Sequence, residues 1–320
     1  MKGLWFEISG TKGYRKVVML LYDHKLSPDL LLGANESASS MKINADKCVA
    51  CGNCIYVCPV GAIYVDPVIN RATVDRNECV ECYACYNGLS SERLNPVLVR
   101  TIRRLFQMVR LRFDPEPDIC PTAAFEPEDL QWPRVVRRAF SDPRATHEST
   151  GVQGRGTEEV KTNDVTERVK HGEVGFTIEF GRPGIGVWFR DIQKMTQALA
   201  SANVPFEKKN PLTLLMSDVS TGTLRKDILD EKILSAIVEI KVPVSRTEEV
   251  VQLVHEVEKD IDSVVALGVG TRCDENGEEH IVAPILERLG YRLERAKTNT
   301  GLGRTTNSAE PSRKEDMAVL

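Results

Sequence analysis

A long apolar run is missing from this sequence. Nowhere in its 320 residues does an unbroken apolar stretch approach the ~18 residues that a membrane-spanning helix requires. The apolar run at residues 17–22 is also too short for the hydrophobic region of an export signal. We therefore expect no membrane span and a cytoplasmic location.

An excess of one charge sign is missing too. The chain has 42 Lys and Arg residues against 46 Asp and Glu residues, for a formal net charge of -4. This balance gives no general attraction to nucleic acid, so no nucleic-acid partner is expected. Any charged surface that binds a partner has to be local.

Sequence motifs of common enzymes are absent as well. The chain has no HExxH, GxSxG, Walker A or Rossmann motif, and no feature that indicates a flavin or nicotinamide site. Its five histidines are scattered at His24, His147, His171, His255 and His280. We expect each of them to be packed or solvated rather than a metal ligand.

Cysteine, in contrast, is abundant and clustered. Eight of the nine cysteines fall between residues 48 and 120. The first group is Cys48, Cys51, Cys54 and Cys58, spaced C-x2-C-x2-C-x3-C and followed by Pro59. The second is Cys79, Cys82 and Cys85; the expected fourth position is Leu89, and a Cys-Pro pair returns only at Cys120. Without an export signal, clustered thiols bind metal rather than form disulfides. The ninth, Cys273, is expected to be a free thiol.

The spacing of these cysteines indicates iron-sulfur clusters. Thiolates are soft ligands that suit iron-sulfur clusters or zinc, but zinc ribbons use pairs of C-x2-C rather than triplets. In double triplets the cysteine before proline ligates the other cluster. The predicted ligands of one 4Fe-4S cluster are Cys48, Cys51, Cys54 and Cys120, and those of the other are Cys79, Cys82, Cys85 and Cys58. Small residues beside them, Gly52, Gly61 and Ala84, would let backbone amides approach the sulfurs.

The cysteines lie in an internal repeat. K-I-N-A-D-K-C-V-A-C-G-N-C matches T-V-D-R-N-E-C-V-E-C-Y-A-C, which predicts two similar halves in a module over residues 41–125. Short strands are expected at 42–44, 62–65 and 73–75. A lead-in segment, residues 1–40, with a strand at 15–22 would precede the module.

A helical insert, residues 86–119, interrupts the second half. Its apolar residues fall on one face at helical spacing: Leu98, Ile102, Leu105, Phe106, Val109 and Phe113. The opposite face carries Arg100, Arg103, Arg104 and Arg110. Pro96 suits the first turn and Asp114-Pro115 the end. The arginines indicate either a solvated surface or a docking surface for an acidic partner protein.

The rest of the chain is predicted to be α+β. Residues 126–170 are expected to form a segment that connects the cysteine-rich module to the α+β region. Their glycines at 151, 154 and 156 could cradle an anion but lack the spacing of a dinucleotide fingerprint. In residues 171–297 we expect strands at 176–180, 211–217, 234–244, 264–270 and 291–296. Helices are expected after Gly186 and at 224–233, 248–261 and 281–289. This pattern predicts a ferredoxin-like split βαβ sandwich that resembles ACT-type domains, with residues 298–320 as a mobile tail.

Two parts of the sequence resemble known families. Residues 41–125 resemble bacterial two-cluster ferredoxins through both triplets and both Cys-Pro pairs, and depart from them by the long insert before Cys120. Residues 154–166 and 172–190 are similar to the iron-sulfur portion of 6-hydroxynicotinate reductase. The second resemblance implies ferredoxin-dependent anaerobic reduction of an aromatic heterocycle in an enzyme that also uses flavin. No cysteines remain here for a further cluster.

Three functions are consistent with the sequence. The first is an electron-transfer protein or subunit that relays single electrons through two 4Fe-4S clusters to or from a redox partner, such as a flavoprotein or a larger reductase complex. The second is a self-contained reductase whose α+β region binds flavin or substrate. The third is a regulatory protein in which an ACT-like domain senses a ligand and the clusters sense redox state or are structural.

Overall fold

The computed structural model describes residues 40–88, 93–111, 119–145, 168–181, 184–272 and 280–291. The chain divides into two compact units, residues 1–37 and 38–320, and all described residues belong to the second. Among them, no helix combines the length and apolarity needed to cross a bilayer. The lead-in strand at 15–22, the glycines at 151–156, Cys273, all but the first residue of the strand expected at 291–296, and the tail at 298–320 lie outside the described residues.

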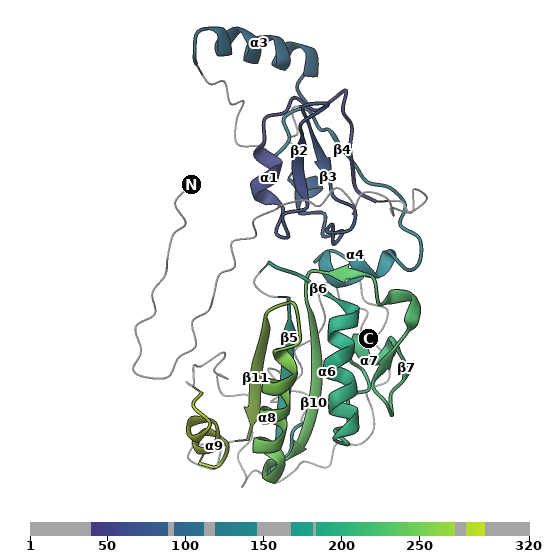
Figure 1. Ribbon diagram of the computed structural model, residues 1–320, viewed down its shortest axis with the longest axis vertical. Helices are drawn as coiled ribbons and strands as arrows, with labels where there is room; N and C mark the ends of the chain where they lie inside the picture. The colour runs from purple at the N-terminus through teal and green to yellow at the C-terminus, as the bar shows by residue number, and fades with distance from the viewer. Residues whose placement is uncertain are drawn as a thin grey trace, which may run out of the picture. The chain divides into compact units, whose positions relative to one another are not determined.

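The cysteine-rich module is built from short elements (Figure 1). They are β1 (Lys42–Ile43), α1 (Asn53–Val57), β2 (Ile63–Asp66), β3 (Arg71–Val74), α2 (Ala84–Asn87), α3 (Pro96–Met108) and β4 (Phe125–Glu126). β2 pairs antiparallel with β3, and β1 pairs antiparallel with β4, Lys42 opposite Glu126. The second pairing brings the end of the module back to its start, and β4 is an element that the sequence did not predict.

Helix α3 is the predicted insert helix, but it is shorter than predicted. Its start is fixed locally, because the Asn95 side chain accepts hydrogen bonds from the backbone N–H groups of Val97 and Leu98 at 2.9 and 3.3 Å. It ends at Met108, before the expected stop at 114. Leu98 and Leu105, which lie on its apolar face, are 60% and 59% exposed.

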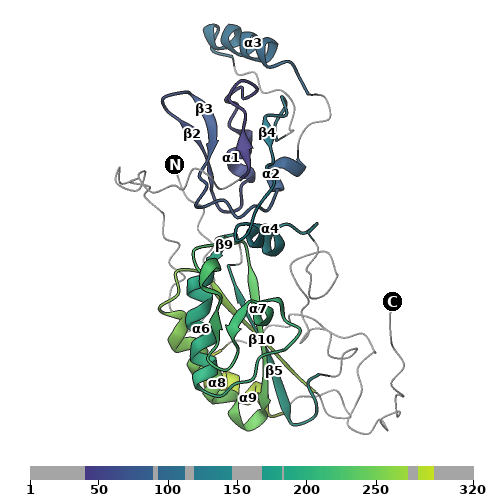
Figure 2. The same ribbon diagram turned by 90° about the vertical axis from the view of Figure 1, so that its right-hand side faces the viewer.

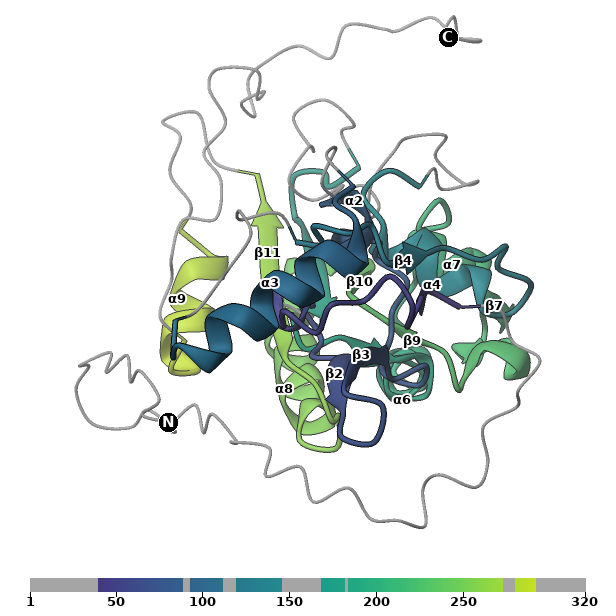
Figure 3. The same cartoon turned by 90° about the horizontal axis from the view of Figure 1, so that it is seen from above.

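A three-stranded antiparallel sheet forms the centre of the C-terminal region. Its strands are β5 (Glu173–Phe180), β10 (Ala236–Pro243) and β11 (Val265–Thr271), in the order β10-β5-β11. Helices α6 (Phe189–Ser201) and α8 (Thr247–Glu258) lie on one side of this sheet (Figures 2 and 3), and α9 (Val282–Arg288) follows β11. Phe176, Ile178 and Phe180 of β5 pack with the helices in a continuous core.

The connection through α8 places β10 and β11 on either side of β5, as in a split βαβ unit. On the side of β10 away from β5, Phe206 forms a single antiparallel bridge with Ile240. A fourth strand of the sheet would pair at this edge. The α+β class is confirmed. The likeness to ACT-type domains stays a prediction.

Two predicted elements between α6 and β10 are wrong. The strand predicted at 211–217 is wrong at its start, where residues 211–214 form helix α7 (Pro211–Leu214), because Asn210 caps it by accepting from the N–H of Leu212 at 2.9 Å. Only its end falls in a strand, at Met216 and Ser217. The helix predicted at 224–233 is replaced by short pieces. These are β8 (Thr223–Leu224), which pairs with β7 (Met216–Asp218), a 3-10 turn (Lys226–Ile228), and β9 (Lys232–Ile233), which pairs with β6 (Val187–Trp188). Pairing with distant strands overrides a weak local pattern.

Residues 126–170 contain a helix that the sequence did not predict. This is α4 (Val135–Ser141), and its buried Val136 and Phe140 belong to the C-terminal core. Phe140 meets Phe189 edge to face, with ring centroids 5.6 Å apart. α4 therefore packs on the C-terminal sheet region while its arginines reach the cysteine-rich module.

Candidate metal centre

The described cysteines gather around two cavities. The first site is lined by Cys48, Cys51, Cys54 and Cys120, and the second site by Cys58, Cys79, Cys82 and Cys85. All eight are free thiols. The structure thus brings Cys120 to the first triplet and Cys58 to the second, which is the crossed grouping expected from the spacing.

The two triplet loops follow the same backbone path. Ala50 and Gly52 in the first loop have φ angles of 54° and 83°, and the equivalent Glu81 and Tyr83 in the second have 54° and 59°. Left-handed φ angles are uncommon for residues other than glycine. Their recurrence at the same two positions shows that the sequence repeat is also a structural repeat.

The two Cys-Pro turns repeat as well. In each, the N–H three residues after the cysteine donates to the cysteine carbonyl, and the N–H four residues after it donates to the cysteine Sγ. The donors are Gly61 (3.2 Å) and Ala62 (3.2 Å) for Cys58, and Ala123 (3.3 Å) and Ala124 (3.2 Å) for Cys120. Cys120 therefore has the same local geometry as Cys58, although the insert separates it in sequence from the second triplet.

The donor set fits an iron-sulfur cluster in each cavity. Burial, together with the neighbouring Cys51 thiol, raises the pKa of Cys54 to about 12, and burial raises the pKa of Cys79 to about 12. Such thiols stay protonated at neutral pH unless a cationic group stabilises the thiolates. In the described part of the chain, no three His, Cys, Asp or Glu side chains are placed to hold one metal ion. A four-iron cluster is larger than one ion, so its four thiolates stand farther apart.

Backbone amides also approach the sulfurs, as a cluster site requires. The N–H groups of Ala50 and Ala72 donate to Cys48 Sγ at 3.5 and 3.4 Å. Backbone hydrogen bonds from Asn53 and Ala84, which hold equivalent positions in the two loops, partly offset the effect of burial on the pKa of Cys51 and Cys82. These donors are distributed over both halves of the repeat, with Ala72 an additional one at the first site.

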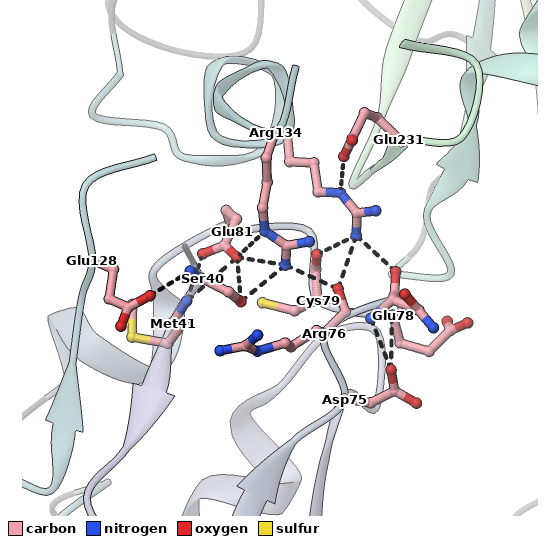
Figure 4. A network of polar contacts seen from close by, with 12 residues as sticks. Ser40, Met41, Asp75, Arg76, Glu78, Cys79, Glu81, Glu128, Arg134 and Glu231 are labelled. Carbon is pink, nitrogen blue, oxygen red and sulfur yellow. Dashed lines mark hydrogen bonds and ion pairs between the residues drawn. The ribbon is translucent and has the colours of Figure 1, made fainter. Parts of the chain in front are cut away.

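A buried ion pair supports the second triplet loop (Figure 4). Arg134 donates to Glu81 Oε1 through Nε at 3.0 Å and Nη2 at 2.7 Å, and the Glu81 side chain is fully buried. Arg134 Nη2 also donates to the carbonyl of Arg76 and to Ser40 Oγ, both at 2.9 Å. The pair ties α4 to the loop between Cys79 and Cys82.

A second buried arginine of α4 contacts the same loop. Arg137 is 3% exposed, and its Nη1 donates to the carbonyls of Asn77 and Cys79, both at 2.7 Å. Its Nε forms an ion pair with Glu231, which follows the 3-10 turn of the C-terminal region. The backbone at Gly184 also comes close to this site: a Cβ added there would stand 3.2 Å from the carbonyl oxygen of Pro59, which lines the second cavity. No sequence motif predicted that Arg134 or Arg137 belongs to the site.

Helix α3 contributes charges beside the first site. Arg100 donates to the carbonyl of Asp46. Burial raises the pKa of Cys51, and the positive charge of Arg103 is one of the influences that oppose this rise. Arg104 and Arg110 are exposed. Two of the four arginines predicted as a docking surface therefore lie near the first site, and the other two face solvent.

Comparison with known proteins agrees with the geometry. Residues 40–88 match the family of 4Fe-4S dicluster domains, and the matched part includes seven of the cysteines but not Cys120. No curated protein and no solved structure matches the chain. The prediction of a ferredoxin-type iron-sulfur domain is confirmed over these residues, and the match supports an iron-sulfur electron-transfer role. The resemblance to 6-hydroxynicotinate reductase stays a prediction.

Proposed function

We propose that this chain is an electron-transfer protein or subunit that relays single electrons through two 4Fe-4S clusters to or from an oxidoreductase. The observation that carries the proposal is the crossed grouping of four thiols around each of two cavities. When bound, each cluster takes up or gives back one electron without breaking a bond. The free thiols and the family resemblances favour a cytoplasmic partner in anaerobic metabolism.

The protein keeps the two sites close together. Helix α1 carries Cys54 of the first site, and Cys58 of the second site caps its C-terminus. The rise of 1.5 Å per residue puts their Cα atoms ~6 Å apart along the helix axis. One helical turn therefore links the two sites, which favours direct electron exchange between them.

Metal analysis and EPR of anaerobically purified protein test the proposal. We expect about eight iron atoms per chain and, after reduction with dithionite, EPR signals from two 4Fe-4S clusters that each take up one electron. A preparation that holds zinc at the thiols, or iron with no reducible signal, would refute the electron-transfer role.

We further propose that α3 docks an acidic electron-carrier protein next to the first site. Arg100, Arg103 and Arg104 of α3, and Arg110 just after it, are not accompanied by any Asp or Glu between residues 93 and 112. Exposed Leu98 and Leu105 supply apolar contact area on the same helix. A positive surface beside a redox site steers an acidic partner to the productive orientation.

Neutralising two exposed arginines, one in α3 and one just after it, should slow this encounter. For Arg104→Gln/Arg110→Gln we expect electron transfer from an acidic flavodoxin to be about tenfold slower at low ionic strength, because electrostatic steering is weakened. The difference should shrink as salt screens the charges. Stopped-flow absorbance measures the rate. The matched control, Lys208→Gln/Lys209→Gln, removes two exposed charges from the C-terminal region, and an equal slowing in that control would count against a specific surface.

A further inference from the structure

We infer that Arg137 makes the second site the first to be reduced, by raising its reduction potential above that of the first site. The inference rests on the proposed function. The step is the transfer of one electron from a low-potential donor to the cluster held at the second site. The donor is oxidised by one electron, and no bond forms or breaks and no proton moves.

The position of the guanidinium carries the argument. Arg137 Nη1 donates to the carbonyl of Cys79, a proposed ligand, while its Nε contacts Glu231. The positive charge therefore lies between the triplet loop and its counter-ion. Because the cation is nearer to the site than the anion, their combined field stabilises an added electron there.

Burial makes this field effective. Arg137 is 3% exposed, and its partner Glu231 has a side chain 13% exposed. Charges away from water are screened far less than surface charges. Arg134, the buried cation just before α4, is paired with Glu81, whose carboxylate belongs to the second-site loop itself, so it mainly offsets that anion.

The charged side chains described beside the first site are less buried than Arg137. The ion pair beside the first-site loop, Lys47 with Glu126, has side chains 46% and 47% exposed, so water and salt screen it. Arg100 and Arg103 also lie beside this site, but both are only half-buried, and Arg104 and Arg110 are exposed. Water therefore screens these arginines more than it screens Arg137. The backbone N–H donors to sulfur are shared by both halves, with one additional neutral donor, Ala72, at the first site. The main electrostatic difference between the sites is therefore the buried Arg137–Glu231 pair at the second site, whose cation contacts the triplet loop.

A potentiometric titration of the cluster-loaded protein, followed by EPR, tests the inference. The signal of the second site is identified as the one that Cys82→Ser removes. In the unsubstituted protein we expect this signal to develop at the higher potential. In Arg137→Gln the ratio of reduced to oxidised second site at a fixed potential should fall about tenfold, because a buried unit charge has been lost. The first site should titrate unchanged.

Two further variants separate charge from structure. Glu231→Gln removes the counter-ion, so it should move the second site to higher potential, opposite to Arg137→Gln. Arg137→Lys keeps the charge and should stay near the original potential. Simple loosening of the loop would move Arg137→Gln and Glu231→Gln in the same direction. Arg190→Gln, whose side chain is 49% exposed and paired with exposed Asp230, is the control and should move neither site.

The results distinguish failure of this inference from failure of the proposed function. Protein without reducible clusters would overturn both. Two reducible clusters with the first site reduced first, or a second-site potential that does not respond to Arg137→Gln and Glu231→Gln, would overturn the role of Arg137 alone. If Arg137→Gln did not load clusters, Glu231→Gln and Arg137→Lys would still decide the question.

Discussion

Cys120→Ser is expected to halve the iron content, from about eight atoms per chain to about four, and to leave the second site loaded. The reason is the crossed grouping of the thiols. Cys120 lines the first cavity with Cys48, Cys51 and Cys54, although it follows the second triplet in sequence. Its loss removes one of four proposed ligands from that cavity, and the four cysteines of the second cavity remain in place.

Alkylation of the folded variant with iodoacetamide, followed by mass spectrometry, shows which thiols have been released. In Cys120→Ser the first triplet should react and the second should stay protected. Cys58→Ser is the matched control, since it removes the other cysteine that precedes a proline. It should expose the second triplet and spare the first. Reaction of Cys79, Cys82 and Cys85 in Cys120→Ser would show that each triplet keeps its own fourth ligand.

Arg134→Met is expected to lower the free energy of unfolding by about 3–5 kcal/mol, because it leaves a buried carboxylate without its partner. The Glu81 side chain is fully buried, and Arg134 contacts it through two nitrogens at 3.0 and 2.7 Å. Ser40 Oγ, which donates to Glu81 at 2.9 Å, cannot neutralise the charge. Urea denaturation of the cluster-loaded protein, followed by circular dichroism under anaerobic conditions, measures the change.

Two comparisons test the cause of this loss. Glu81→Gln/Arg134→Met should recover much of the lost stability, since no unpaired charge stays buried. Lys259→Met breaks an ion pair with Glu256 whose side chains are 41% and 68% exposed, and it should cost less than about 1 kcal/mol. A loss in Arg134→Met no larger than that of Lys259→Met would show that the buried pair contributes little.

Local chemistry explains what the sequence could predict. The spacing of the cysteines is a constraint on a few successive residues, so it predicted the iron-sulfur domain, and it also predicted that Cys120 would lie with the first triplet, as it does around the first cavity. The start of α3 was readable for the same reason, because Pro96 follows a capping residue. Helices α6 and α8 were found because their apolar residues recur at helical spacing and a large core covers them.

Features that depend on distant contacts could not be predicted. Whether Leu98 and Leu105 are buried depends on what packs against α3, and their spacing carries no information about that. The pairing of β1 with β4 joins residues at opposite ends of the module. Arg134 and Arg137 lie in a stretch rich in proline and charge, so only the folded chain shows that α4 brings them to the second triplet loop.

The position of the insert also determines which site has all its cysteines first during synthesis of the chain. All four cysteines of the second site lie between residues 58 and 85, whereas those of the first site extend from 48 to 120. Ribosomes add about 5–20 residues per second from the N-terminus, so the second set is complete before Cys120 has been made. A nascent chain therefore has all four proposed ligands of the second site while the first site still lacks Cys120. A truncated chain that ends within α3 would retain the four proposed ligands of the second site and so could hold a single cluster.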